Sequence, residues 1–315
     1  MRLLRLIGLP VFILTVTTCL AQLPKVVLNA TSSTFSPAIT KFNDQFSIAW
    51  TTRYEIRTAF TNNLALIQND LGHPLGQFSR HGPALTVFHN LLYIAWTGTD
   101  KYALLNVMSS KDGVNFVNKV TLREDGASGP ALAVFNNRLY LAWTGVDQQH
   151  SLNIISSADG VNFSGKQILG QSSISAPALM ATPARWPNTG MKEQLFITWT
   201  GPDKGMNVAT SNDGVHFDFT STRIPSETSN DRPVLFPWKN GNGTPILTLW
   251  FTGTDSRLNS LASVYVEPFS SGSTFGQQQK QTFDDTSVAG PSMYNGYLAW
   301  SGTDGAHHLN IKLVQ

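Results

Sequence analysis

Charged residues are scarce in this 315-residue chain: Asp, Glu, Lys and Arg make up 13% of it, about half the usual share. This scarcity excludes a coiled coil, a helical protein with a charged solvated face and a polyelectrolyte tail. The formal net charge of +2 comes from Arg2 and Arg5, and the rest of the chain is balanced. A neutral chain lacks the basic surface that binds a nucleic-acid backbone or an anionic membrane.

Cysteine is almost absent. The single cysteine, Cys19, excludes an intrachain disulfide and a cysteine-based metal site. The histidines show no metal-binding spacing, and loop histidines usually face water. The sequence therefore predicts no metal and no cofactor. Hydrophobic residues, at 41%, still supply enough apolar surface for a folded core.

The first 21 residues are typical of a signal peptide. A basic start is followed by an apolar core at residues 6–20 and by a small-residue cleavage motif that ends at Ala21. We expect cleavage before Gln22 and export of the mature chain, which has no second apolar run long enough to cross a bilayer. An uncleaved anchor and a lipoprotein modified at Cys19 are the alternatives. Sequons, which matter only in a host that glycosylates them, stand at Asn29, Asn162 and Asn242.

Beyond this segment, one motif repeats at spacings of 46, 47, 47, 56 and 58 residues. Each copy begins with a proline and an apolar run, then a turn and an alternating strand that ends in an aromatic residue. A Thr-Gly-x-Asp segment, a Leu-Asn strand, an Asp-Gly hairpin and a fourth strand complete the unit. The prolines that open the copies are Pro37, Pro83, Pro130, Pro177, Pro233 and Pro291.

Four short strands joined by turns at this period predict one blade of a β-propeller. The last copy stops after three strands, and Lys25-Val-Val-Leu28 resembles the fourth strands of other copies, such as Lys119-Val-Thr-Leu122. We therefore predict an all-β, six-bladed β-propeller of four-stranded antiparallel blades, a single domain over residues 22–315. The N-terminal strand at residues 25–29 should close the last blade by pairing with residues 310–314.

Three hairpins share the pattern Ser-x-Asp-Gly-x-x-Phe; they are Ser110–Phe116, Ser157–Phe163 and Ser211–Phe217. The pattern resembles the Asp box of the sialidase-like, or BNR-repeat, propellers, which is commonly one residue longer and ends in Trp. The resemblance implies the six-bladed fold more than an activity. The carboxylate of each box can accept N–H groups of its own turn. We therefore predict a structural role, on the rim opposite the Thr-Gly-x-Asp loops, for Asp112, Asp159 and Asp213.

A sialidase of this family would use three arginines on the substrate carboxylate, a Tyr–Glu nucleophile pair and an acid/base Asp. Its first arginine usually stands in an Arg-Ile-Pro at the start of the first blade. Here that position reads Phe35-Ser-Pro-Ala-Ile39, and an Arg223-Ile-Pro225 occurs only after the box of the fourth blade. The catalytic residues therefore do not carry over.

The first blade departs from the repeat, because Thr51–Arg57 replaces the Thr-Gly-x-Asp segment and concentrates charge there. Arginine can bind a carboxylate or sulfate with two hydrogen bonds, and Tyr54 beside Glu55 is a weak candidate nucleophile pair. A rim of salt bridges without a ligand is the alternative. The ligand-binding candidates on this rim are Arg53, Arg57, Arg80, His81, Arg232 and Arg257.

Repeated aromatic and acidic residues admit two interpretations. We interpret the aromatic residues as packing between blades and the Asp residues as caps of their own turns; sugar stacking and ligand binding are the alternatives. The aromatic set is Trp50, Trp96, Trp143, Trp199, Phe251 and Trp300. The acidic set is Asp100, Asp147, Asp203, Asp255 and Asp304.

The predicted function is non-catalytic binding of an extracellular glycan or another polar, anionic small ligand on the rim of the Thr-Gly-x-Asp loops. Near-identical repeats fit multivalent binding better than a single asymmetric catalytic centre. The alternatives are a sialidase-like glycoside hydrolase that uses Tyr54 and Glu55, and a protein-interaction scaffold.

Overall fold

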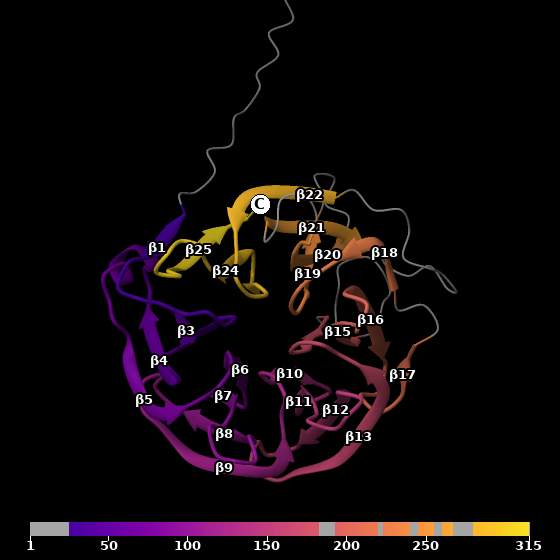
Figure 1. Cartoon of the computed structure of the whole chain (residues 1–315). Coiled ribbons are helices and arrows are strands. Elements are labelled where there is room, and N and C mark those ends of the chain that lie inside the picture. Colours follow the sequence, from indigo (N-terminus) through magenta and orange to yellow (C-terminus); the bar gives the residue numbers. More distant parts are fainter. Residues whose placement is uncertain are drawn as a thin grey trace, which may run out of the picture.

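A computed structural model describes residues 25–182, 193–219, 223–239, 245–254, 260–266 and 280–314. Six antiparallel sheets stand around a common axis, and the chain runs through them in order (Figure 1). The predicted all-β, six-bladed propeller is confirmed. The signal peptide predicted for residues 1–21 lies outside the described residues. Within the described part of the chain, no helix is long and apolar enough to cross a membrane.

Each blade runs outward from the axis in four steps. The innermost strands are β2 (Ala38–Phe42), β6 (Ala84–Phe88), β10 (Ala131–Phe135), β14 (Ala178–Ala181), β19 (Val234–Lys239) and β23 (Ser292–Tyr294). The second strands are β3 (Gln45–Thr52), β7 (Leu91–Thr97), β11 (Arg138–Thr144), β15 (Leu195–Thr200), β20 (Pro245–Thr252) and β24 (Tyr297–Ser301).

The third strands are β4 (Glu55–Thr61), β8 (Leu104–Ser110), β12 (Ser151–Ser157), β16 (Gly205–Ser211), β21 (Ser260–Val266) and β25 (Leu309–Leu313). The outer strands are β5 (His73–Phe78), β9 (Phe116–Asp125), β13 (Phe163–Ser172), the pair β17 (Phe217–Asp218) and β18 (Arg223–Thr228), β22 (Lys280–Thr286) and β1 (Val26–Leu28). A short 3-10 helix, η1 (Leu64–Ile67), stands between β4 and β5.

The N-terminal strand closes the ring, as predicted. In Figure 1, β1 lies beside β25 although the two strands come from opposite ends of the chain. They pair antiparallel, with Val27 opposite Asn310 and Leu28 opposite Leu309. The pairing joins residues 26–28 to residues 309–311, so it is shorter than the predicted pairing of 25–29 with 310–314 and begins one residue earlier on the partner strand. This register places the apolar Leu28 and Leu309 together in the core between the last blade and the first.

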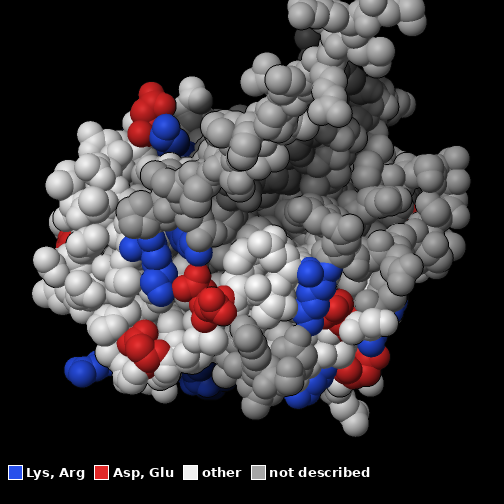
Figure 2. Space-filling view, turned by 90° about the horizontal axis from the view of Figure 1, so that it is seen from above, with Lys and Arg blue, Asp and Glu red and all other residues white. Residues whose placement is uncertain are grey.

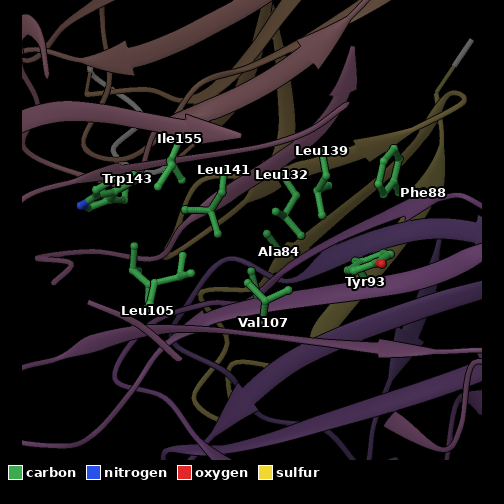
Figure 3. Packing of buried hydrophobic residues seen from close by; sticks show 12 residues of the cluster. Ala84, Phe88, Tyr93, Leu105, Val107, Leu132, Leu139, Leu141, Trp143 and Ile155 are labelled. Carbon is green, nitrogen blue, oxygen red and sulfur yellow. The ribbon is translucent and has the colours of Figure 1, made fainter. Parts of the chain in front are cut away.

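Apolar cores form between neighbouring blades. Figure 3 shows the core between the second and third blades, where Leu105 and Val107 of β8 face Leu141 and Trp143 of β11. The repeated tryptophans are all buried in this way, and Phe251 is buried in register with them. Their burial supports packing between blades and removes these rings as open sugar-stacking platforms.

In several blades, a lysine at the outer strand lies over the ring of the repeated aromatic residue of its own blade. The same lysine also binds a side chain of the preceding blade. The Nζ atom of Lys166 lies 5.5 Å from the ring centroid of Trp143 and forms an ion pair with Glu124 of β9. A cation over an aromatic ring adds about 0.5–1 kcal/mol at an exposed site. We call this arrangement the lysine clasp. It recurs at Lys119 with Trp96 and Gln77, Lys280 with Phe251 and Glu227, and Lys25 with Trp300 and Asp285.

The surface charges follow the same pattern of short-range pairing. On the face shown in Figure 2, basic and acidic side chains of the described residues lie beside one another and form no continuous patch of one sign. Positive and negative charges, which are nearly equal in number in the sequence, thus also lie close to one another on this face.

Closure of the ring gives the first prediction. Deleting residues 25–30 should lower the melting temperature sharply, because the deletion exposes the edge of β25 and the core under Leu28. Leu28→Ala should lower the free energy of unfolding by about 2–5 kcal/mol, as for other fully buried leucines. The exposed neighbour Asn29 is the control, and Asn29→Ala should change stability by less than about 0.5 kcal/mol. An unchanged melting curve for the deletion would show that β1 does not hold the ring.

Candidate functional site

The loops fall on two rims of the ring. The turns between second and third strands share one rim with the connections between blades, as the bridges of Ser79 with Gly98 and of Ser287 with Gly302 show. We call this the loop rim. The turns between third and fourth strands lie on the opposite rim, and in the second, third and fourth blades they carry the Ser-x-Asp-Gly-x-x-Phe hairpins. We call these hairpins the Asp boxes, after the motif that they resemble, and this rim the box rim.

The repeated Asp residues of the loop rim serve their own turns. Asp147 accepts hydrogen bonds from the backbone nitrogens of Gln149 at 3.1 Å and Ser151 at 3.2 Å. Asp100 and Asp304 accept equivalent bonds from their own turns. Asp203 accepts from Gly205 and also binds the guanidinium of Arg223. Asp255 lies outside the described residues. These four carboxylates are therefore already engaged in turn capping.

The Asp boxes have the same internal character. The Oδ1 atom of Asp159 accepts hydrogen bonds from the backbone nitrogens of Asn162 at 2.8 Å and Val161 at 2.9 Å, and from the hydroxyl of Ser157. The bonds from Asn162, Val161 and Ser157 lower the pKa of Asp159, because they favour the charged form. Asp112 and Asp213 are held in the same way, with pKa values lowered by their hydrogen bonds.

The charged segment of the first blade divides into an exposed turn and a structural ion pair. Arg53 and Tyr54 form the turn, both with positive φ, and the Tyr54 side chain is 58% exposed. Glu55 accepts a hydrogen bond from Nε of Arg57 at 2.8 Å.

Arg57 in turn fastens a second loop of the first blade. Its Nη1 atom donates to the carbonyls of Leu71 and Gly72 at 2.9 and 3.2 Å. Gly72 has a φ of 69°, and a Cβ atom there would lie 2.3 Å from the ring of Trp50. Arg57 and Glu55 therefore hold this turn against the buried Trp50, which gives them a role in the fold.

Arg80 and His81 lie on the connection into the second blade. The exposed Arg80 donates from Nη2 to the carbonyl of Thr99 at 3.2 Å. His81 is partly buried, with its ring edge-on to Phe35 at 5.9 Å. Burial lowers the pKa of His81, against the opposing effect of Asp231. Burial therefore favours the uncharged form of this imidazole.

A pocket of about 260 Å³ opens at the centre of the loop rim, where the connections between blades meet; we call it the axial mouth. Its walls include Phe35, His81, Asp231 and Arg232. A second cavity, of about 650 Å³, runs along the innermost strands. Arg232 lines both spaces, and it is the residue that their walls share.

Arg232 breaks the repeat at this point. It precedes the opening proline of the fifth blade, a position that is small in every other copy: Ser36, Gly82, Gly129, Ala176 and Gly290. The Arg232 side chain is 6% exposed and reaches across to donate to the carbonyl of Pro37 at 3.1 Å. A Cβ atom at Gly290 would lie 2.5 Å from the backbone oxygen of Arg232 and 2.7 Å from its Cγ, so the two connections approach too closely for a larger residue at position 290.

The guanidinium of Arg232 is poorly satisfied. Its Nε atom is buried without a hydrogen-bond partner among the described residues. The adjacent carboxylate of Asp231 is occupied by the backbone nitrogens of Arg232 at 2.7 Å and Gly290 at 2.8 Å. Burial lowers the pKa of Arg232, with Asp231 opposing the effect, but an arginine remains charged. The axial mouth thus contains a buried cation with an unpaired donor.

The structure brings together only part of the predicted set. His81 and Arg232 share the axial mouth, Arg80 stands next to it, and Arg53 and Tyr54 lie further out on the same rim. Arg257 lies outside the described residues. The sequence contained a sharper signal than charge: alignment of the residue before each opening proline shows a single large side chain at position 232. Exposed aromatic residues on the loop rim, Phe78 and Tyr102, were also missed.

Comparisons with known proteins define the fold. Neither a scan of protein-family models nor a search of curated proteins finds a match. Among solved structures, the SapL1 lectin in complex with alpha methyl fucoside superposes with a TM-score of 0.61 at 10% identity, over 90% of this chain and 94% of that one. A protein of unknown function from Dyadobacter fermentans gives 0.60 at 11% identity, over 93% and 99%.

A sialidase from Trypanosoma rangeli gives a TM-score of 0.57 at 13% identity. The match covers 89% of this chain and 53% of the sialidase, so the chain spans about half the length of that enzyme. At such low identity these likenesses show the propeller fold alone.

The Asp boxes give a pH-dependent prediction. Because the folded-state pKa of Asp159 is lowered, its stabilising effect is complete above the unfolded value of about 3.9 and is lost as the pH falls below it. Asp159→Ala should therefore lower the melting temperature at pH 7, and the difference from wild type should shrink below about pH 4. Binding at the loop rim should be retained. The control is Asp44→Asn, because Asp44 is exposed and asparagine also tolerates its φ of 60°; this variant should leave the melting temperature nearly unchanged. A loss of binding in Asp159→Ala at an unchanged melting temperature would contradict the structural role.

Proposed function

We propose that this protein is exported and binds an extracellular glycan or another polar ligand with an anionic group, without catalysis, at the axial mouth of the loop rim. The observation that carries the proposal is Arg232, a buried and poorly satisfied guanidinium at a position where five other repeats need only a small residue.

The energetics support a ligand at Arg232. Burying a charge costs several kcal/mol, which the nearby Asp231 offsets only in part for Arg232, and each unsatisfied buried donor costs about 1–3 kcal/mol. The other copies fold with Gly, Ala or Ser at this position, so the ring does not require an arginine. A carboxylate or sulfate could accept two parallel hydrogen bonds from the guanidinium and would satisfy the unpaired Nε.

The fold comparisons support a glycan as the ligand. The SapL1 lectin was solved with a fucoside and the Trypanosoma rangeli enzyme is a sialidase, so propellers of this shape serve carbohydrate recognition in both a lectin and an enzyme. The predicted signal peptide of residues 1–21 would bring the chain to extracellular glycans. Fold alone does not determine function, so the site residues carry the proposal.

The arrangement of Tyr54 and Glu55 favours binding over catalysis. A tyrosine nucleophile needs a base that is free to take its proton. The Glu55 carboxylate instead holds Arg57, which fastens the turn at residues 71–72. Tyr54 is therefore better suited to ligand contact than to attack on a glycosidic bond.

The test of the axial mouth is Arg232→Ala, which copies Ala176 of the fourth blade. Its affinity for glycans identified on an array should fall at least tenfold, which corresponds to about 1.4 kcal/mol. Its melting temperature should stay the same or rise, because a buried charge is removed. Arg123→Ala, an exposed arginine on β9, should leave both quantities unchanged. Full affinity in Arg232→Ala would overturn the assignment of the site.

A fluorogenic sialoside assay separates binding from catalysis. Wild type should release no fluorophore, and Tyr54→Phe should keep most of the affinity for the glycan found on the array. Turnover by wild type that is abolished in Tyr54→Phe, with binding retained, would establish the hydrolase alternative. Among the arginines of this loop, Arg53→Ala is the variant to measure beside Tyr54→Phe. Arg57→Ala is less suitable, because it would also release the turn at residues 71–72.

A further inference from the structure

Three large apolar side chains of the first two blades are exposed on the loop rim. The exposed fractions are 58% for Tyr54, 52% for Phe78 and 60% for Tyr102. At these exposures, the three aromatic rings do not belong to the apolar core. Exposed clusters of aromatic residues in soluble proteins commonly mark a binding surface.

The repeats act as internal controls for these positions. The residue equivalent to Phe78, the last of each outer strand, is polar in the next four copies: Asp125, Ser172, Thr228 and Thr286. The residue equivalent to Tyr102 is Gln149 in the third blade and Ala306 in the sixth. The same turns therefore form without an aromatic side chain, and folding does not explain the aromatic residues.

Backbone contacts place the three rings on adjoining loops. Ser79, the neighbour of Phe78, donates from its backbone nitrogen to the carbonyl of Tyr54 at 2.7 Å. Ser79 also forms a bridge with Gly98, at the start of the turn that carries Tyr102. Arg80 reaches the same turn through the carbonyl of Thr99.

The charge around these rings is predominantly positive. Arg53 and Arg80 are exposed, and Nζ of Lys101 lies 4.5 Å from the ring centroid of Tyr102. Of the nearby acids, Asp100 is engaged with the backbone of its own turn and Glu55 is paired with Arg57. Asp125 is half-buried at the end of β9. Three basic side chains therefore flank the three aromatic rings.

We propose that Tyr54, Phe78 and Tyr102, together with Arg53, Arg80 and Lys101, form a second binding site for an acidic polysaccharide chain. We call it the aromatic patch. The apolar faces of successive sugar rings would pack on the aromatic side chains, while carboxylate or sulfate groups bind the flanking cations. This site differs from the axial mouth, because it would bind several successive sugars of a polysaccharide, whereas the mouth would bind a single anionic group.

The experiment measures retention and affinity on four polysaccharides. Heparin and dextran sulfate carry sulfates, polygalacturonate carries carboxylates, and dextran is the neutral control. Wild type should bind at least one acidic polymer, should not bind dextran, and should lose affinity as salt rises. Binding to the sulfated or to the carboxylated polymers identifies which anionic group the site accepts.

Variants copied from the repeats keep the fold intact. Phe78→Ser with Tyr102→Gln, taken from Ser172 and Gln149, should weaken binding at least tenfold without lowering the melting temperature. The matched control is Ile168→Gln, because Ile168 is 67% exposed on β13, away from this rim. It should bind as wild type does.

The outcomes separate this proposal from the one for the axial mouth. Arg232→Ala should retain binding to the acidic polymer while losing the ligand of the mouth. Equal binding to dextran would overturn the acidic specificity. Unchanged affinity in the double aromatic variant, with loss only in Arg80→Ala, would show simple ionic capture and overturn the aromatic patch. Failure to retain any of the acidic polymers would overturn it as well.

Discussion

The pairing of β1 with β25 is the constraint on which the rest of the ring depends. Every other blade is built from strands that are close in sequence, so its sheet can form locally. The last blade needs a strand from the far end of the chain, and only Val26–Leu28 supplies it. The axial mouth exists because this closure brings the connections of all six blades to one axis. Arg232 and Pro37, which lie two blades apart, can meet only in a closed ring.

Much of this fold could be predicted because the same structural unit is repeated in the sequence, so each copy gives independent evidence for its strands and turns. The turns, the Asp boxes and the number of blades all follow from patterns that occur several times in the chain. The register of the closing strand was predicted less well, since Lys25–Leu28 occurs once and its partner strand offers several alternating positions. The pairing of β1 with β25 is set by the burial of Leu28 in the core between the last blade and the first. That core exists only in the assembled ring, so the register could not be predicted from the strand sequences alone.

The candidate site was less predictable, for a physical reason. A charged residue in a sequence does not reveal whether its partner is a neighbour, a carbonyl or a ligand. Glu55 and Arg57 satisfy one another and a local turn, whereas Arg232 stands buried with its Nε unpaired among the residues that the structure describes. Deviation from the repeat is the better guide. It singles out Arg232, Phe78 and Tyr102, and it passes over the repeated Asp residues, which cap their own turns in the four blades where the structure describes them.

The lysine clasp has a consequence for how such a ring can grow. Lys119 reaches back to the first blade, and Glu124, five residues later on the same strand, receives Lys166 of the third. Lys280 and Asp285 show the same offset on β22. Each of these two repeats thus carries both contacts of a junction: a lysine that binds the preceding blade and an acidic residue that binds the lysine of the next blade. A gene segment duplicated in tandem would insert a blade that already fits its neighbours on both sides, so the number of blades can change without new contacts being invented.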